Sequence, residues 1–566
     1  MIRRDGTTLG QYEAAVSGAL SDLRANRAVE RMLEGDHTLW GPEPDEIADR
    51  LGWLESPETV GAEIPRLKGL AGEIKSEGIE HVLLMGMGGS SLAPEVFGFA
   101  PGGSEGHPDL TVLDSTDPQA VRNVADRLDL SRTVFIVSTK SGGTVETFSF
   151  FKFFYNRVGE LVDGDPGSRF IAITDPGSGL QETAERYSFR ETFLNDPNIG
   201  GRYSALSLFG MVPAALIGAD VKRLLDSGAA ARRECSTPAS EENPGAYLGA
   251  AMGELARNHG RDKLTFFTSP KTAPFGPWVE QLIAESTGKN GTGILPVTGE
   301  PPGSTDAYGD DRVFVRLALR GESTPETDGL LAGLREAGHP VVEILLEDEY
   351  DLGGEMMRWE VATAIAGERL GINPFDQPNV ESAKVQARSM LAAYQDEGKL
   401  PPLEPTATDG SLSVFSEGES PDNVEDAITQ FLASPNAGDY IALQAYLPPG
   451  DTTTRALQGL RGRLRDGHRL ATTFGYGPRF LHSTGQLHKG DGGGGLFVQI
   501  TADHPDDAGI PDEAGESESS VSFGVLIDAQ ALGDRQALLD NDRRFIRVHL
   551  GSDVEGGLDR LADILK

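Results

Sequence analysis

Between about residues 81 and 218, short apolar runs alternate with polar loops and with longer segments that carry apolar residues at helical spacing. Uninterrupted apolar runs of this length are typical of strands buried on both faces of a parallel sheet. The alternation of such strands with helices predicts a doubly wound α/β unit. The predicted strands lie at 79–85, 110–113, 133–137, 169–174 and 189–193.

The same pattern recurs twice further along the chain. A second α/β unit is predicted from strands at 263–268, 312–318 and 341–345 and from helices at 277–286 and 354–370. A third is predicted from strands at 440–446, 496–500, 522–527 and 545–549 and from a helix at 453–465. Residues 400–422 are rich in Pro, Thr, Ser and acidic residues without periodicity, which predicts a linker.

Apolar residues at helical spacing between Tyr12 and Leu33 predict that the chain begins with helices that cover the first sheet. We therefore expect four parts, which agrees with a length of 566 residues. They are a helical cover (1–75), the first unit (76–240), the second unit (241–398) and, after the linker, a third domain of α/β type (423–566).

Charge and cysteine content exclude several classes of function. The formal net charge is −37, from 87 Asp and Glu against 50 Lys and Arg, and it would repel nucleic acid and anionic membrane surfaces. Cys235 is the single cysteine, so no intramolecular disulfide is possible, and no Cys and His spacing indicates zinc. Without a predicted signal peptide or membrane span, we expect a cytoplasmic protein.

The first candidate site is the loop Ser138-Thr-Lys-Ser-Gly-Gly-Thr-Val-Glu-Thr147, which follows a buried strand and opens a helix. Hydroxyl groups and free N–H groups converge at such a helix start, where the helix dipole adds positive potential. This arrangement is suited to a phosphate group. The alternative is that these Ser and Thr residues are ordinary turn and N-cap residues.

A second loop of the same kind, Gly86-Met-Gly-Gly-Ser-Ser-Leu-Ala-Pro94, follows the strand at 79–85. A dinucleotide site is the alternative here, but only Asp114 stands where an acidic ribose partner is expected. Two ligand loops at the carboxyl ends of parallel strands favour one small phosphorylated molecule, bound at a switch point of the sheet.

Three other stretches carry groups suited to catalysis. Arg202 lies in a glycine-containing loop, Glu285 lies in the last turn of a predicted helix with Gln281 one turn earlier on the same face, and residues 475–490 contain His482 and His488. The alternatives are an arginine bound to a surface carboxylate, a solvated glutamate and a mobile surface loop.

Five separated stretches together resemble the phosphoglucose isomerase family, in the order in which that family carries its motifs. They are Gly86-Met-Gly-Gly-Ser90, the loop 138–147, Gly200-Gly-Arg-Tyr-Ser204, Glu285-Ser-Thr-Gly-Lys289 and Asn373-Pro-Phe-Asp-Gln-Pro-Asn-Val-Glu-Ser-Ala-Lys384. The resemblance covers about residues 80–385 and implies two sugar-isomerase (SIS) domains of doubly wound parallel-sheet type. The flanking regions are most similar to the isomerase half of bifunctional transaldolase/phosphoglucose isomerase proteins.

The resemblance implies isomerisation of glucose 6-phosphate to fructose 6-phosphate through a cis-enediol, without a metal or other cofactor. It assigns sugar contacts to Gly89 and Ser90, and phosphate contacts to Thr139, Lys140, Ser141 and Thr144. Glu285 would move a proton between C2 and C1 beside Gln281, Arg202 would stabilise the enediolate, and Lys384 with Gln377 would bind the hydroxyl end and assist ring opening.

The chain departs from the family at the histidine that opens the sugar ring, because residues 299–308 lack it. We hypothesise that His482 or His488 of the third domain replaces it. If so, a monomer would be competent, although a homodimer also stays open. Two other functions are weighed against this one: a non-catalytic sensor of sugar phosphates, and an isomerase of another phosphorylated aldose such as mannose 6-phosphate.

Overall fold

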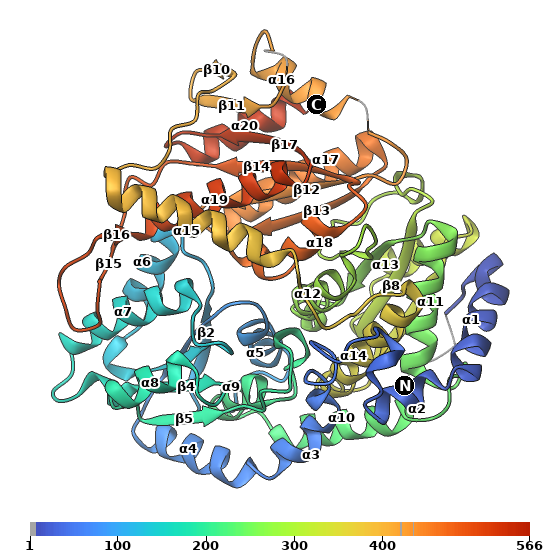
Figure 1. The fold of residues 1–566 in the computed structure, drawn as a ribbon, viewed down its shortest axis with the longest axis horizontal. Coiled ribbons are helices and arrows are strands. Elements are labelled where there is room, and N and C mark those ends of the chain that lie inside the picture. The colour runs from blue at the N-terminus through green and yellow to red at the C-terminus, as the bar shows by residue number, and fades with distance from the viewer. Residues whose placement is uncertain (1–6, 419–420, 434, 566) are drawn as a thin grey trace.

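The computed structural model describes residues 7–418, 421–433 and 435–565, so residues 1–6 of the predicted cover lie outside the described residues. Three mainly parallel sheets, each flanked by helices, follow one another along the chain. In Figure 1 the third domain, drawn in orange and red, lies above the first unit and the second unit. The predicted α/β class is confirmed.

The first sheet has the order β2-β1-β3-β4-β5 and is parallel throughout. Its strands are β1 (His81–Gly86), β2 (Asp109–Leu113), β3 (Thr133–Ser138), β4 (Phe170–Thr174) and β5 (Glu191–Leu194). The helices of this unit are α5 (Leu92–Phe99), α6 (Pro118–Arg127), α7 (Val145–Gly159), α8 (Gly179–Arg186), α9 (Leu208–Leu216) and α10 (Val221–Cys235). Because Gly86 pairs with Ser138, the loops after β1 and β3 lie side by side.

The second sheet is also parallel, with the order β7-β6-β8-β9. Its strands are β6 (Lys263–Thr268), β7 (Leu295–Val297), β8 (Arg312–Leu319) and β9 (Val341–Leu346). The helices are α11 (Pro244–His259), α12 (Phe275–Thr287), α13 (Pro325–Glu336), α14 (Asp351–Leu370) and α15 (Val380–Glu397).

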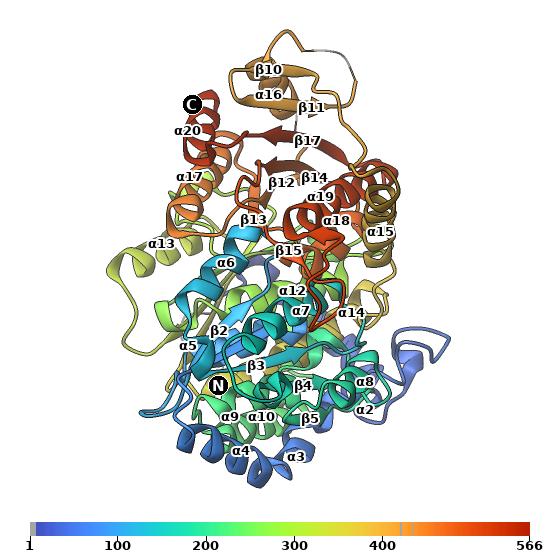
Figure 2. The same ribbon diagram turned by 90° about the vertical axis from the view of Figure 1, so that its left-hand side faces the viewer.

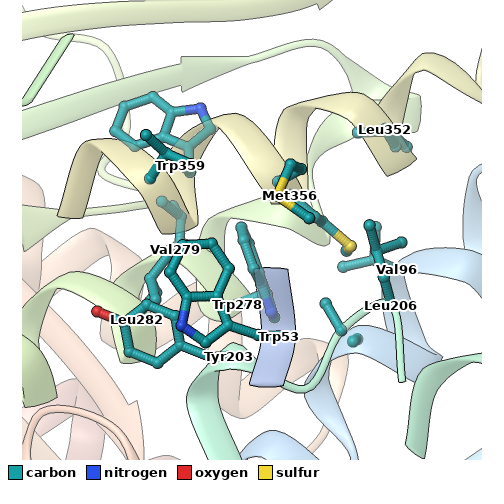
Figure 3. Close-up of a cluster of buried hydrophobic side chains, with 14 of the residues drawn as sticks. Trp53, Val96, Tyr203, Leu206, Trp278, Val279, Leu282, Leu352, Met356 and Trp359 are labelled. Atoms are coloured by element: carbon teal, nitrogen blue, oxygen red, sulfur yellow. The ribbon is translucent and has the colours of Figure 1, made fainter. Parts of the chain in front are cut away.

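The N-terminal helices pack on both units rather than on the first sheet alone. These helices are α1 (Glu13–Ala25), α2 (Ala28–Leu33), α3 (Ser56–Gly61) and α4 (Ile64–Ser76). Helix α1 contacts α11 of the second unit, and α4 contacts α9 of the first unit. Figure 3 shows the result, a core in which Trp53 of the cover packs beside Val96, Trp278 and Met356 from the two units. One hydrophobic core therefore holds cover, first unit and second unit together.

The third domain has a separate hydrophobic core and a sheet of order β10-β11-β17-β14-β12-β13. Its parallel strands are β12 (Tyr440–Tyr446), β13 (Ala471–Tyr476), β14 (Gly495–Thr501) and β17 (Arg544–His549). Its helices are α16 (Val424–Leu432), α17 (Asp451–His468), α18 (Gly485–Gly490), α19 (Phe523–Asp540) and α20 (Val554–Ile564). Between β14 and α19, the short strands β15 (Gly509–Ile510) and β16 (Val521–Ser522) form a hairpin that reaches α7, as Figure 2 shows.

Two predictions for this domain are wrong. The run 522–527 is the start of α19 and not a strand, because Ser522 caps the helix by accepting a hydrogen bond from the Val525 N–H. Part of the predicted linker forms the strands β10 (Ala407–Asp409) and β11 (Leu412–Ser416), and β11 pairs antiparallel with β17. Both strands are too short to leave a clear periodicity in the sequence.

Helix α15 connects the second unit to the third domain. It is largely exposed, with Ala383 as its buried residue, and it packs along α19. The packing is close, because a Cβ atom at Gly533 would lie 2.6 Å from the backbone nitrogen of Ala387. None of the helices formed by the described residues is long and apolar enough to cross a membrane.

Candidate active site

The first unit, the second unit and the third domain meet at Gly88, in the loop after β1. Gly88 has a φ of +54°, and a Cβ there would lie 2.8 Å from Nε2 of Gln281 and 2.9 Å from the carbonyl oxygen of His482. Only glycine fits such a left-handed, crowded position without strain. The first unit, the second unit and the third domain thus each present a loop or helix end to the same point.

A cavity of about 500 Å³ opens at this meeting point. A volume of this size fits a small phosphorylated metabolite. Its walls are formed by Met87, Gly88, Gly89, Ser90, Thr139, Lys140, Ser141, Thr144, Asp175, Gly201, Arg202, Gln281, Glu285, Gln377, Val380, Glu381, Lys384 and His482. Every site residue predicted from the sequence lines this cavity except His488.

The loop 139–144 forms the wall below the N-terminus of α7. The hydroxyl groups of Thr139 and Thr144 are hydrogen-bonded to each other, with an oxygen-to-oxygen distance of 2.8 Å. Lys140 also lines the cavity, but it forms an ion pair with Asp175 and donates to the carbonyl oxygen of Pro197 at 2.9 Å. The hydroxyl groups and the helix N-terminus can therefore meet an anion directly, while the charge of Lys140 is already partly compensated.

Glu285 and Gln281 face the cavity from the last two turns of α12. Nε2 of Gln281 donates to Oε2 of Glu285 at 3.0 Å, and both side chains are buried. Oε1 of Gln281 is buried and has no hydrogen-bond partner within the part of the chain that the structure describes. A buried acceptor of this kind is suited to a hydroxyl group of a ligand.

Arg202 lies in the short helical turn between β5 and α9 and is 2 % exposed. Its Nη1 lies 3.8 Å from Oε1 of Glu285 and donates to Oε1 of Gln377 at 3.0 Å. Its Nε donates to the Ser286 hydroxyl at 2.7 Å. The guanidinium is thus fixed beside the carboxylate rather than bound to a surface acid.

The loop that carries Gln377 is held by two cations of the site. Nη2 of Arg202 donates to the carbonyl oxygens of Pro374 and Asp376, at 2.7 Å and 3.0 Å. Nζ of Lys289 donates to the side-chain carboxylate of Asp376 at 2.6 Å, and burial lowers the pKa of this lysine to about 8. Lys384 follows on the first turns of α15 and reaches the cavity from its exposed side.

The structure separates the two histidines. His482 lies in the 3-10 turn Arg479–His482 after β13, lines the cavity, and its Nε2 lies 2.9 Å from Oε1 of Glu146 on α7. His488 lies on α18 inside the third domain, 2 % exposed, where its ring packs against Phe497 and Phe480. Burial holds the pKa of His488 well below its usual value. His488 therefore stands outside the cavity, because its side of α18 faces Tyr440, Phe480 and Phe497 of the third domain.

Sequence reasoning missed Glu146, although it lies within the phosphate loop. Burial alone would raise the pKa of this carboxyl group, but the neighbouring charge and hydrogen bond of His482 outweigh burial, so its pKa lies below the usual value. Acidic residues are common in the first turn of a helix, where they interact favourably with the helix dipole. The sequence therefore does not distinguish Glu146 from such a residue, because its partner His482 lies in a distant segment.

No group of three His, Cys, Asp or Glu side chains that could hold a metal ion is present among the described residues. The polar side chains that line the cavity are hydroxyls, amides, cations and the carboxylates of Asp175, Glu285 and Glu381. Such a set can bind an anionic polyhydroxy ligand and move protons.

The fold and site have relatives among known proteins. A sequence model of the family described as "Phosphoglucose isomerase" matches residues 65–293. A protein of Rubrobacter xylanophilus named glucose-6-phosphate isomerase is 31% identical over 417 residues, which are 62% of this chain and 94% of the relative. The chain belongs to the phosphoglucose isomerase family.

Two solved structures resemble the fold. A hypothetical protein of Thermus thermophilus matches with a TM-score of 0.58 and 25% identity, covering 68% of this chain and 99% of that protein. A glucose-6-phosphate isomerase of Chlamydia trachomatis matches with a TM-score of 0.55 and 19% identity, covering 67% of this chain and 86% of that protein. The stretch matched by the family model contains Arg202 and Glu285 but ends before Lys384 and His482.

Proposed function

We propose that this chain is a glucose-6-phosphate isomerase, which interconverts glucose 6-phosphate and fructose 6-phosphate. The observation that carries the proposal is the placement of Glu285 and Arg202, 3.8 Å apart, in the cavity that also contains the loop 139–144. A sensor of sugar phosphates would need the loop but not this buried carboxylate and guanidinium. Membership of the phosphoglucose isomerase family supports the same reaction.

The substrate phosphate binds at the N-terminus of α7, where it meets Ser141 and the hydroxyl groups of Thr139 and Thr144. Lys140 adds positive charge while it stays paired with Asp175. The sugar then extends past Gly89 and Ser90 toward α12, where Oε1 of Gln281 accepts a hydrogen bond from one of its hydroxyl groups.

Ring opening is assigned to His482, with Lys384 beside it. Because Nε2 of His482 faces Glu146, Nδ1 is the ring nitrogen left for the sugar. Nδ1 takes the proton of the C1 hydroxyl and passes it to the ring oxygen O5, as the C1–O5 bond breaks and C1 becomes a carbonyl. Gln377 and Lys384 bind the hydroxyl end of the opened chain.

Isomerisation itself is assigned to Glu285. Its carboxylate takes the proton from C2 of the open aldose and returns it to C1 of the cis-enediol, so one group serves both carbons. Between these two steps the hydroxyl proton on O2 passes to O1, so that C2 becomes the carbonyl. The negative charge that develops on the oxygens faces the guanidinium of Arg202, which is already fixed by Ser286 and by the 374–377 loop. Proton transfer of this kind between neighbouring carbons is the chemistry of aldose and ketose interconversion.

The third domain supplies the ring-opening histidine from within the same chain, so we propose that a monomer is competent. The likeness of the flanking regions to the isomerase half of bifunctional transaldolase/phosphoglucose isomerase proteins stays a prediction, as does the cytoplasmic location. The test compares isomerase activity per chain at protein concentrations where sedimentation shows monomers and where it shows dimers. We expect the same activity per chain at both. Activity confined to a dimer would contradict it.

A coupled assay of fructose 6-phosphate formation tests the function. Glu285→Gln should lower kcat by about 10³-fold or more and keep sugar-phosphate binding, because the amide cannot accept the C2 proton. The matched control is Glu336→Gln at the exposed end of α13, which should behave as the parent. If the parent binds glucose 6-phosphate tightly without turning it over, the result would favour a sensor of sugar phosphates. If it turns over mannose 6-phosphate and not glucose 6-phosphate, mannose 6-phosphate would be the substrate.

A further inference from the structure

A glutamine of the third domain, Gln530 on α19, reaches the carboxylate that holds His482. Its Nε2 donates to Oε1 of Glu146 at 2.8 Å, the same oxygen that faces Nε2 of His482 at 2.9 Å. On its other side, Oε1 of Gln530 accepts from the hydroxyl group of Thr116 at 2.8 Å. Gln530, Glu146 and Thr116 are 4 %, 4 % and 0 % exposed.

Only one orientation of the Gln530 amide satisfies this chain of bonds. Its NH₂ group must face the carboxylate, since its carbonyl oxygen would repel Oε1 of Glu146. The Thr116 hydroxyl then fixes that orientation by donating to the carbonyl oxygen. The Glu146 carboxylate is therefore held in place by Gln530 and not by His482 alone.

Gln530 does not line the catalytic cavity itself. It lies with Glu146 on the wall of a neighbouring cavity of about 330 Å³, which shares Lys384 and His482 with the catalytic cavity. Its hydrogen bond to Glu146 gives it a route to the substrate through His482.

We propose that Gln530 is a positioning residue for ring opening: its amide orients the Glu146 carboxylate, which in turn fixes the ring and the tautomer of His482. The inference rests on the proposed function. A carboxylate that accepts two hydrogen bonds keeps its charge and its direction, so it receives the Nε2–H of His482 and leaves Nδ1 for the sugar. The third domain thus supplies both the histidine and the group that aligns its partner.

The test separates ring opening from isomerisation. In a Glu285→Gln background, the parent can still open and close the ring, and exchange NMR measures this as interconversion of the α and β anomers of glucose 6-phosphate. Adding Gln530→Met should slow the enzyme-catalysed exchange roughly 10-fold, because a misplaced catalytic group loses rate steeply with distance. Gln536→Met is the matched control, since Gln536 lies on the same helix and bonds the exposed Asp540.

A second readout is the pH profile of kcat/KM with Glu285 intact. Loss of one hydrogen bond to the ionised form raises the pKa of Glu146, so the acid limb of the Gln530→Met profile should move to higher pH. Gln530→Glu should move it further, because a second carboxylate would face Glu146. Thr116→Val should shift the acid limb in the same direction by a smaller amount. This variant replaces Gln530→Met in the test if Gln530→Met does not fold.

Parent-like anomer exchange together with a parent-like acid limb in the folded Gln530 or Thr116 variants would overturn the inference while leaving the proposed function intact. Absence of glucose 6-phosphate turnover in the parent itself would overturn the proposed function instead.

Discussion

The first two units and the third domain contribute to the same cavity in different ways. The first two units share one hydrophobic core, and their helices pack backbone to backbone: a Cβ at Gly353 on α14 would lie 2.2 Å from the carbonyl oxygen of Leu224 on α10. The third domain has its own core, and it also packs Phe523 and Leu526 of α19 against apolar residues of the first unit. The turn that carries His482 is held to the first unit by ion pairs, Arg479 with Asp114 and His482 with Glu146.

This difference separates the two halves of the proposed chemistry. Proton transfer between C2 and C1 depends on Glu285 and Arg202, which are fixed within the shared core of the first two units. Ring opening depends on His482, whose position rests on contacts between domains. Perturbing those contacts should impair ring opening before it impairs proton transfer.

Among changes to the third domain, the largest expected effect comes from the histidine itself. His482→Asn should lower kcat/KM for glucose 6-phosphate about 100-fold, because the amide can still bond Glu146 but cannot transfer a proton. In the Glu285→Gln background the same change should abolish enzyme-catalysed anomer exchange. His488→Asn is the control, and per folded molecule it should keep both the isomerisation rate and the rate of anomer exchange. If His488→Asn lost these rates while His482→Asn kept them, His488 and not His482 would be the ring-opening histidine.

A smaller effect is expected from the ion pairs that dock the turn of His482. Arg479 lies 3.0 Å from Oδ2 of Asp114 and also pairs with Glu95, and burial raises the pKa of the Asp114 carboxyl. Arg479→Met should lower kcat/KM roughly 10-fold and reduce thermal stability, since a buried carboxylate loses its partner. Steady-state kinetics and thermal unfolding measure both effects.

The double variant with Asp114→Asn should recover part of the lost stability, because it removes the unpaired carboxylate. Arg560→Met, which breaks an exposed ion pair with Asp409 on the far side of the third domain, should leave activity unchanged. Equal losses in Arg479→Met and Arg560→Met would contradict a specific role for the docking contact.

The smallest effect concerns Glu280 of α12, which accepts from the Thr298 hydroxyl at 3.1 Å and from the Ser483 hydroxyl, next to His482, at 3.4 Å. Burial raises its pKa to about 7, against the opposing charges of Arg461 and Arg479. The folded state therefore binds this proton more tightly than the unfolded state. The stabilisation of the folded state by this proton is fully present below about pH 4.5 and is lost as the pH rises through about 7.

Glu280→Gln removes the ionisation, so the free energy of unfolding of the parent should fall relative to the variant by roughly 1–3 kcal/mol between pH 5 and pH 8. Urea unfolding at several pH values measures this difference. Parallel profiles for parent and variant would show that Glu280 does not titrate in this range.

Much of the first two units could be predicted because their signals are local. Each buried strand, its glycine or serine loop and the following helix lie within about 25 residues, so periodicity and turn chemistry identify them together. Arg202, Gln281 and Glu285 stand in such local contexts, and the structure brings them to one cavity. Their roles stay predictions until the variants are measured.

The third domain was harder to predict, because its elements and its site depend on contacts between distant segments. The apolar run 522–527 suits a strand or a helix equally. The Ser522 cap and the packing of Phe523 and Leu526 on the first unit make it a helix. Strands β10 and β11 form only because β17, more than 120 residues later, offers a free edge.

By itself, the sequence determined that this protein has parallel α/β units with a phosphate loop, a carboxylate and an arginine arranged as in the phosphoglucose isomerase family. Only the tertiary structure decided which histidine joins them. His482 and His488 are six residues apart in one polar stretch, and no local pattern distinguishes them. Docking of the third domain on the first unit turns His482 toward Glu146, and packing within the third domain encloses His488 among aromatic rings. Tertiary packing and not local propensity sets the direction of each side chain.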